Sequence, residues 1–317
     1  QAYDKNKHCI IKAICDIDQK KISKYKNLYP NAIFYSDSNQ LINNNDIDVI
    51  SIASFDNFHF DQVIKSIKNH KNIFVEKPMC LTTDELAKII KLKKKNKRIV
   101  ISSNMVLRAN PRFQYLKKML DSGKFNDLYY IEADYYWGRV NKLSQWRSKI
   151  NNYSIILGAS IHLIDLILWL LNKKPVYVEA QGNNIGSTKN MIKSDTFSSL
   201  NLIFKNNLII RINSHSLAVH PHYHSFKFFS KKTTFFHQFN NSFILNDNNP
   251  RQPISIRKPY PFKENRSLII DNFINKILGK PVKFEYVSFS EIRDSMSICF
   301  AALNSKIRKS RVKIKYY

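Results

Sequence analysis

Short apolar runs alternate with segments of helical periodicity over the first third of the chain. Residues 19–28, 37–44 and 86–95 have the spacing of surface helices, and Thr82 with Glu85 predicts a capping box at the start of the last one. Strands that alternate with helices indicate a parallel sheet, so we predict an α/β, Rossmann-like sheet here. The runs that we expect to be strands are residues 8–16, 32–35, 49–53, 73–75 and 98–103.

From residue 128 the pattern changes to apolar and aromatic runs joined by short polar turns, such as residues 205–207. Such a succession predicts an α+β domain with a large, mostly antiparallel open sheet. Its expected strands are residues 129–137, 176–181, 197–204, 208–214, 225–229, 233–239 and 243–245. Its expected helices are residues 111–122, 160–171, 268–278 and 288–305. We place the boundary near residues 104–110 and expect two domains, residues 1–107 and 108–317.

Composition indicates where the protein is located and which partners it has. Of its 317 residues 44% are hydrophobic, but no apolar run reaches 18 residues, so we expect no membrane span. The four cysteines lack metal-ligand spacing, and buried thiols in a reducing, cytoplasmic compartment fit them best. The net charge of +27 suggests nucleic-acid binding, but no nucleic-acid module surrounds the scattered lysines. A positive field that attracts anionic substrates remains an alternative.

Candidate chemistry follows the strand 73–75, where Glu76, Lys77 and Pro78 stand in succession. Ligands of α/β sheets bind outside the carboxyl ends of parallel strands, which is where this charged pair falls. A salt bridge at the strand end, without function, is the simpler interpretation of Glu76 and Lys77 alone.

The flanking sequence favours a function. Residues 46–59, Asp-Ile-Asp-Val-Ile-Ser-Ile-Ala-Ser-Phe-Asp-Asn-Phe-His, then a helix and Glu76-Lys77-Pro78, resemble the Gfo/Idh/MocA family. The resemblance extends over essentially the whole chain. It implies an NAD(P)-dependent oxidoreductase that acts on a sugar, a sugar nucleotide or a cyclitol. It also implies that residues 1–107 bind a dinucleotide and that residues 108–317 bind substrate and mediate oligomerisation.

The chain departs from the family pattern at three places. Its first glycine is Gly123, so we expect the sequence to begin after the first strand and its Gly-rich turn, with residues 1–5 matching the end of the first helix. Ser54 and Phe55 replace a Thr-Pro pair. Gly158 stands where many members carry an aspartate, four residues before a helical histidine.

The cofactor is expected to be NAD, with NADP less favoured. Asp16 ends the strand 8–16, where an acidic side chain can accept hydrogen bonds from the adenosine ribose, and no Arg follows to receive a 2′-phosphate. An ordinary aspartate at a strand end is the alternative. The resemblance implies cofactor contacts from Asp16, Ser54, Phe55, Asn57, His59, Glu76, Lys77 and Arg108.

His162 and Asp165 lie three residues apart on an otherwise apolar segment, hence on one face of a helix. A histidine packed in the core is the alternative. The resemblance implies that Lys77 and His162 are catalytic, one stabilising a developing alkoxide and the other exchanging a proton. The implied substrate-binding residues are Lys77, Trp146, Arg147, His162 and Asp165.

We therefore predict an NAD-dependent sugar dehydrogenase without a metal. Its alternative is a non-catalytic binding or scaffold protein of the same fold, supported by the missing Gly-rich turn and by Gly158. We further expect a homodimer or homotetramer that pairs through the open face of the sheet, where Tyr130, Tyr136 and Phe204 supply apolar area.

Overall fold

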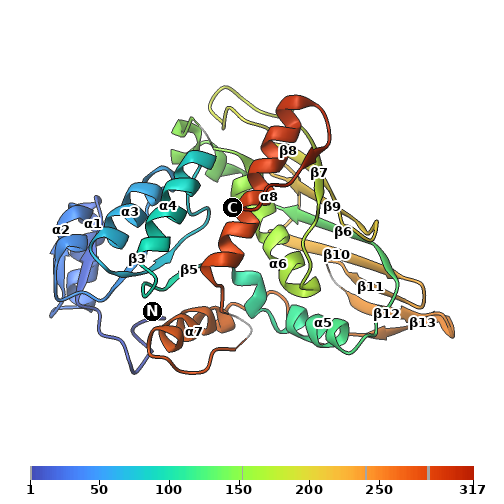
Figure 1. Ribbon diagram of the computed structural model, residues 1–317, viewed down its shortest axis with the longest axis horizontal. Coiled ribbons are helices and arrows are strands. Elements are labelled where there is room, and N and C mark those ends of the chain that lie inside the picture. The colour runs from blue at the N-terminus through green and yellow to red at the C-terminus, as the bar shows by residue number, and fades with distance from the viewer. Residues whose placement is uncertain (1, 152, 240, 284–285) are drawn as a thin grey trace. The chain divides into compact units, whose positions relative to one another are not determined.

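The computed structural model describes residues 2–151, 153–239, 241–283 and 286–317. The chain divides into two compact units (Figure 1). Unit 1 comprises Gln1–Asn104 and Lys263–Ile292, and unit 2 comprises Met105–Phe262 and Arg293–Tyr317. The second boundary differs from the continuous domain expected for residues 108–317, because residues 263–292 belong to unit 1.

Parallel strands form the centre of unit 1, as predicted. In the described residues β1 pairs only with β2, while β3, β4 and β5 form a separate sheet in that order. Burial alternates along β3, since Ile50 and Ile52 are buried whereas Ser51 between them is exposed. The strands are β1 (Ala13–Cys15), β2 (Ile33–Tyr35), β3 (Val49–Ile52), β4 (Asn72–Val75) and β5 (Ile101–Ser103).

Local signals position the helices of unit 1. Thr82 and Glu85 form the predicted capping box, in which each side chain accepts a hydrogen bond from the other residue's backbone N–H. The carboxylates of Asp18 and Asp37 accept backbone N–H groups at the starts of the helices Gln19–Leu28 and Ser38–Asn43. The helices are α1 (Gln19–Leu28), α2 (Ser38–Asn43), α3 (His59–Lys68) and α4 (Thr83–Lys95).

The first strand is shorter than predicted. Residues 8–16 were expected to be extended throughout, but β1 contains only Ala13–Cys15, and Ile10 is 90% exposed. The partner strand β2 offers three residues, so three ladder positions are all that it can satisfy. The expectation for residues 1–5 falls partly on Gln1, outside the described residues, and residues 2–5 form turns.

Helix α7 (Ser267–Ile277) explains why unit 1 is formed by two separate segments of the chain. Its Phe273 packs against Phe74 of β4, with ring centroids 5.4 Å apart. Its Asp271 accepts a hydrogen bond of 2.7 Å from Asn6. These contacts bind a segment from late in the chain to unit 1, and hydrophobic periodicity alone does not reveal them.

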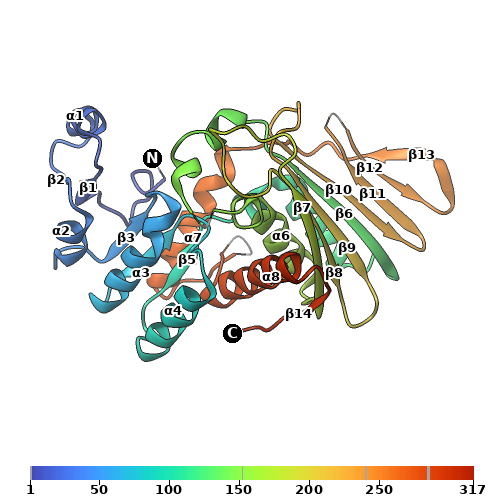
Figure 2. The ribbon, with the colours of Figure 1, turned by 90° about the horizontal axis from the view of Figure 1, so that it is seen from above.

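Unit 2 is organised by a large sheet, as Figure 2 shows. In the described residues its strand order is β13-β12-β11-β10-β6-β9-β8-β7-β14, and β6 with β9 is the parallel pair among antiparallel neighbours. The mostly antiparallel open sheet was predicted, whereas β13 and β14 were not. The strands are β6 (Leu128–Tyr136), β7 (Tyr177–Asn183), β8 (Phe197–Ile203), β9 (Ile209–His215), β10 (Tyr223–Ser230), β11 (Thr233–His237), β12 (Ser242–Asn246), β13 (Asn249–Ser255) and β14 (Val312–Lys313).

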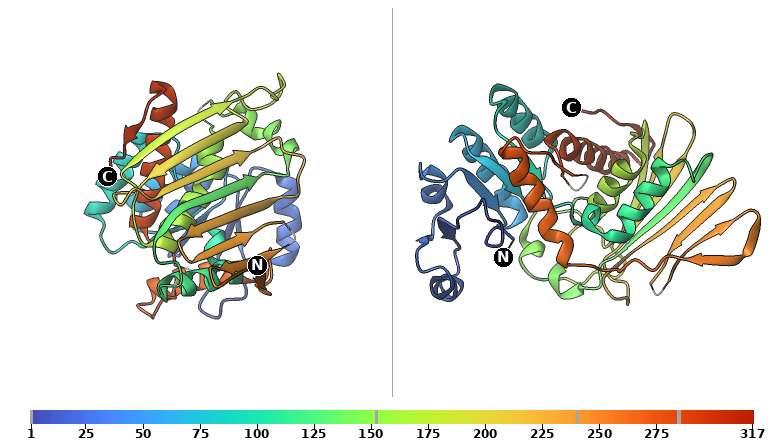
Figure 3. Two further views of the ribbon diagram at one scale, coloured as in Figure 1. Left: turned by 90° about the vertical axis from the view of Figure 1, so that its right-hand side faces the viewer. Right: turned by 90° about the horizontal axis from the view of Figure 1, so that it is seen from below.

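One face of this sheet is covered by helices, and Figure 3 shows the other face from the front. Ile131, Ala133 and Tyr135 of β6 are buried, whereas Tyr130 and Tyr136 alternate with them and are partly exposed. The covered face packs on α5 (Pro111–Asp121) and α6 (Ile161–Leu171). The placement of Phe204 on the open face was wrong. Its side chain is 3% exposed, because alternation from Ile203 turns it to the other side.

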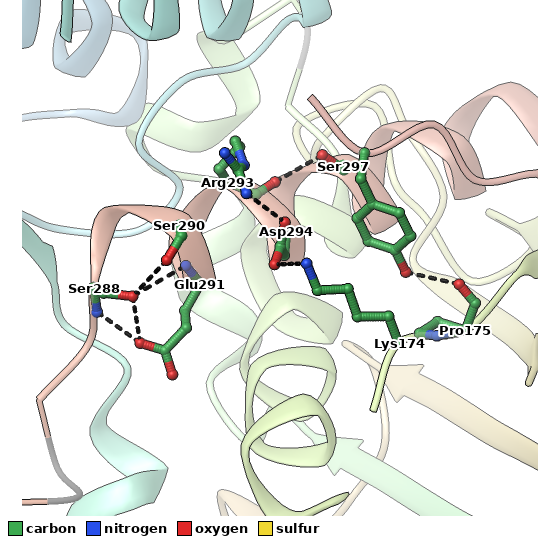
Figure 4. Close-up of polar contacts among 9 residues, drawn as sticks. Lys174, Pro175, Ser288, Ser290, Glu291, Arg293, Asp294 and Ser297 are labelled. Carbon is green, nitrogen blue, oxygen red and sulfur yellow. Dashed lines mark hydrogen bonds and ion pairs between the residues drawn. The ribbon is translucent and has the colours of Figure 1, made fainter. Parts of the chain in front are cut away.

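The last helix, α8 (Phe289–Arg308), is fixed by polar contacts near its start (Figure 4). Within unit 1, the Ser288 backbone N–H and hydroxyl both donate to the carboxylate of Glu291. Within unit 2, buried Asp294 forms an ion pair with Lys174. The hydroxyl of Tyr316 donates to the carbonyl of Pro175 at 2.8 Å, so the C-terminal segment is anchored beside the same loop.

Candidate functional site

The charged loop Glu76-Lys77-Pro78 stands at the carboxyl end of β4, as predicted. Glu76 continues the ladder by donating its backbone N–H to Ile52 of β3 at 2.9 Å. Its carboxylate accepts a 2.6 Å hydrogen bond from the Asn104 side chain, just beyond β5. Lys77 is half-buried, and the peptide bond to Pro78 is cis. Two neighbouring strand ends therefore fix the backbone that carries the Lys77 amine.

His59 joins this loop to the one that follows β3. Its side chain is fully buried, with Nδ1 2.7 Å from the carbonyl oxygen of Pro78 and Nε2 3.1 Å from that of Ser54. The Ser54 hydroxyl in turn donates to Gln62 at 2.7 Å. Sequence reasoning proposed His59 as a cofactor ligand, whereas the geometry gives it the role of holding two strand-end loops together.

Phe55 and Asn57 of the β3 exit loop face solvent, whereas Asp56 between them is buried. Phe55 is 38% exposed and stacks on Phe58 with centroids 6.4 Å apart, and Asn57 is exposed. An exposed aromatic ring beside a strand end offers a surface for a planar group.

Asp16 lies one residue beyond β1, with its carboxylate half-exposed. One oxygen accepts the backbone N–H of Asp18 at 2.9 Å, and the other is 3.4 Å from the Lys21 amine. The sequence argument for NAD considered the two residues after Asp16 and missed Lys21, which the first turn of α1 returns to the carboxylate.

His162 begins α6 in unit 2 and follows a π-helical turn, Ile156–Ser160. Its ring is 8% exposed and lies parallel to that of Tyr135, with centroids 6.0 Å apart. Gly158 in the turn has a specific reason to lack a side chain. A Cβ built there would lie 2.2 Å from the hydroxyl oxygen of Tyr153. The Tyr153 hydroxyl thus occupies the space where the aspartate of the family pattern would begin.

Arg108 and Asp165 form a buried ion pair within unit 2. Nε of Arg108 donates to Oδ2 of Asp165 at 2.9 Å, and Nη2 donates to Oδ1 at 2.7 Å. Each side chain is 1% exposed. The sequence placed Arg108 with the cofactor and Asp165 with the substrate, and it did not foresee that the two bind each other. The bidentate pair fixes the face of α6 one turn beyond His162.

Two histidines that sequence reasoning missed surround Tyr135 with His162. The rings of His222 and His224 lie 5.4 and 4.6 Å from the Tyr135 ring, and Nδ1 of His224 is 2.5 Å from the Tyr260 hydroxyl. Burial raises the pKa of Tyr260 well above its usual range. The signal in the sequence was the alternation of His222 and His224, which two-residue periodicity places on one face of a strand.

Trp146 and Arg147 lie in a 3-10 turn, Trp146–Lys149, and contact each other. The Arg147 guanidinium lies 4.0 Å from the centroid of the Trp146 ring. The rings of Trp137 and Tyr153 lie 5.7 and 6.0 Å from the same guanidinium. Three aromatic faces therefore surround one cation in unit 2.

The described residues offer neither a metal site nor a membrane-spanning helix. They contain no cluster of three or more His, Cys, Asp or Glu side chains that could hold a metal ion. None of the described helices is both long and apolar enough to cross a membrane. The cysteines are free, and burial raises the pKa of the Cys80 thiol well above its usual range.

Unit 1 has parallel strands with polar side chains at their carboxyl ends, where α/β sheets bind their ligands, and unit 2 has a large open sheet. Comparison with protein families shows the class to which this architecture belongs. The family described as "Oxidoreductase family, NAD-binding Rossmann fold" matches residues 1–104, and the "GFO/IDH/MocA C-terminal domain" matches residues 113–236. The chain belongs to the Gfo/Idh/MocA family, which confirms the resemblance seen in the sequence.

Curated relatives include inositol dehydrogenases of bacteria. Inositol 2-dehydrogenase of Salmonella typhimurium is 24% identical over 198 residues, which are 60% of this chain and 57% of that protein. Inositol 2-dehydrogenase/D-chiro-inositol 3-dehydrogenase of Lacticaseibacillus casei is 28% identical over 161 residues, 50% of this chain and 45% of that protein. The chain thus matches about half the length of these relatives.

Solved structures show that the fold is shared over nearly the whole chain. Myo-inositol 2-dehydrogenase from Lactobacillus plantarum superimposes with a TM-score of 0.81 at 19% identity, covering 99% of this chain and 94% of that one. Scyllo-inositol dehydrogenase from Lactobacillus casei, with bound NAD(H) and scyllo-inositol, superimposes with a TM-score of 0.79 at 17% identity. This superposition covers 98% of the present chain and 93% of that one.

Proposed function

We propose that this protein is an NAD-dependent oxidoreductase that transfers a hydride between nicotinamide and a hydroxyl-bearing carbon of a sugar, sugar nucleotide or cyclitol. The observation that carries the proposal is the placement of Lys77. Its backbone is fixed at the carboxyl end of β4 through Glu76–Asn104 and through the His59–Pro78 contact. Family membership supports the reaction type, and the relatives named above act on cyclitols.

The residues of unit 1 fit a dinucleotide at two places. The half-exposed Asp16 carboxylate can accept hydrogen bonds from the adenosine ribose. The exposed loop with Ser54, Phe55 and Asn57, beside Glu76, supports the nicotinamide end. NAD, when bound, supplies the hydride acceptor. We assign His59 an indirect role, since its buried ring holds the two loops.

Lys77 and His162 are the residues to which we assign the chemistry. A cationic amine at Lys77 stabilises the negative charge that develops on the substrate oxygen as hydride leaves its carbon. His162 takes up the hydroxyl proton as a general base, because a neutral imidazole has a ring nitrogen that can accept a proton. Asp165 and Arg108 act together, because the buried pair holds the helix that presents His162. Because the Arg108 side chain is 1% exposed and bound to Asp165, we assign it this structural role in place of the expected cofactor contact.

A substrate screen tests the proposal. We expect NAD reduction, followed by the absorbance of the reduced nicotinamide, with at least one of myo-inositol, scyllo-inositol, levoglucosan or a nucleotide sugar. Lys77→Ala should abolish it while Lys88→Ala, on the exposed side of α4, leaves it unchanged. Absence of turnover with all of these substrates, together with failure to bind NAD, would favour a non-catalytic binding protein.

We also propose that subunits pair through the open face of the large sheet, in a homodimer or homotetramer in the cytoplasm. The rings of Tyr130, Phe229, Phe236 and Phe243 succeed one another across four strands, with centroids 5.8, 6.0 and 4.9 Å apart. A continuous aromatic row on a sheet face supports burial against a second copy. Light scattering that reports a monomer at micromolar concentration would contradict it.

A further inference from the structure

Three cations, Arg139, Lys142 and Arg147, gather in the loop after β6. A cavity of about 400 Å³ in unit 2 lies between Arg139, Lys142 and Gln145, and the remaining lining is Gly138, Val140 and Asn141. The positive charge of Arg147 also acts on Lys142 in the cavity lining. The pKa of Lys142 is lowered by partial burial and further by the positive charges of Arg139 and Arg147. The cavity is therefore a place where positive charge is concentrated.

Among the residues that the structure describes, no ion pair joins Arg139, Lys142 or Arg147 to an aspartate or glutamate. Some lysines elsewhere in the chain do have such a partner, as Lys117 does with Asp121 at 2.7 Å. Repulsion between like charges is left uncompensated here, and an anion would relieve it.

Arg147 is also held in one orientation, which a mobile surface arginine is not. Its guanidinium stacks on Trp146 at 4.0 Å and faces Trp137 and Tyr153. Stacking leaves the N–H groups at the guanidinium edge available, and their fork matches the oxygens of a phosphoryl group. A pre-oriented fork loses less side-chain entropy when it binds than a flexible lysine does.

A row of rings connects this group to His162. Tyr135 stacks parallel to His162 at 6.0 Å, Trp137 lies 5.8 Å from Tyr135, and Arg147 lies 5.7 Å from Trp137. Tyr135 and Trp137 are buried, so this row fixes the position of the Arg147 guanidinium relative to His162 within unit 2.

We propose that Arg139, Lys142 and Arg147 form a subsite for a phosphoryl group on the substrate, which makes the substrate a sugar phosphate or a nucleoside diphosphate sugar rather than a neutral cyclitol. This inference rests on the proposed function for its choice of sugar, whereas the anion subsite itself does not depend on turnover.

Calorimetric titration with inorganic pyrophosphate and with inorganic phosphate at low ionic strength tests the subsite. We expect saturable binding that Arg147→Gln weakens about tenfold or more, the scale of a lost charge-assisted bond. Lys142→Gln, at an exposed position that should not disturb folding, should weaken it in the same direction. Tighter binding of pyrophosphate than of phosphate would indicate the diphosphate of a nucleotide sugar, and equal binding a sugar monophosphate.

The matched control is Lys149→Gln, which removes one charge two residues beyond Arg147. The exposed Lys149, unlike Arg147, is not among the charges that lower the pKa of Lys142. The variant should change the affinity less than twofold. Equal losses in Lys149→Gln and Arg147→Gln would overturn the subsite, because the probe would then sense only the net charge. If pyrophosphate binding depends on Arg147 but the protein oxidises no sugar, the subsite is retained and the proposed function is rejected.

Discussion

Arg108 and Asp165, 57 residues apart in sequence, meet in a bidentate ion pair that is almost completely buried in unit 2. Neither partner can be neutralised without leaving a charge in a low-dielectric interior. The pair stands one turn after His162, so it determines how that histidine is presented.

Asp165→Ala should destabilise the protein strongly, by about 3–5 kcal/mol, because the buried Arg108 guanidinium would lose the carboxylate that balances its charge. Urea unfolding measures this change. Asp121→Ala is the matched control, since it breaks a pair whose carboxylate is 58% exposed and should cost less than about 1 kcal/mol. The double variant Arg108→Met with Asp165→Leu should recover much of the loss. Equal stabilities of Asp165→Ala and Asp121→Ala would contradict the account.

Gly158→Ala should be destabilising although alanine favours helices. The added methyl group would lie 2.2 Å from the Tyr153 hydroxyl oxygen and 2.9 Å from the ring carbon that bears it, so the ring must move. We expect a loss of about 1–3 kcal/mol in thermal or urea unfolding. Adding Tyr153→Phe should restore part of it, because the hydroxyl is the nearest atom. A Gly158→Ala protein as stable as the wild type would show that Tyr153 does not fill this space.

Cofactor preference should depend on Asp16. Its carboxylate would repel a 2′-phosphate, so NAD(H) should bind at least about tenfold more tightly than NADP(H). A tenfold ratio corresponds to a difference of about 1.4 kcal/mol in binding free energy. Asp16→Ala should reduce the ratio, since Lys21 would then be released to contact the phosphate. Fluorescence titration with both cofactors measures the ratio. Tighter binding of NADPH by the wild type would reject the assignment of Asp16.

Low pH should destabilise the folded state of unit 2, because Asp134 on the open face of the sheet becomes protonated. Burial raises the pKa of Asp134, but hydrogen bonds from His215, Asn213 and Ser225 outweigh it and hold the pKa below its usual value of 3.8. A lowered pKa in the folded state stabilises the protein above pH 3.8, and this stabilisation is lost as the pH falls below that value. Asp134→Asn should therefore lower the unfolding midpoint at neutral pH and differ little from the wild type near pH 2. The same difference at both pH values would contradict the assignment.

Periodicity predicted most of the elements because their signals are local. The Thr82–Glu85 capping box and the alternation along β6 each need only a few neighbouring residues. The length of β1 could not be predicted, because it depends on how many residues β2 offers as partners.

The candidate site was predicted in its residue types more than in its contacts. Lys77 falls at the expected strand end, since strand and loop are contiguous in sequence. The pairing of Arg108 with Asp165 depends instead on how α6 packs, which periodicity does not encode. The contact of α7 with Phe74 likewise depends on tertiary packing, so the single domain cut at residue 107 did not anticipate it.

The central claim is that Lys77 and His162 carry the hydride-transfer chemistry. Single-turnover reduction of NAD, with the substrate that the screen identifies, tests it most directly. We expect Lys77→Ala and His162→Ala each to slow the reaction by about 10²–10⁴-fold while NAD binding is retained. If both groups act on the same proton, the double variant should lose much less than the product of the single losses. Near-wild-type rates in both single variants would contradict the account.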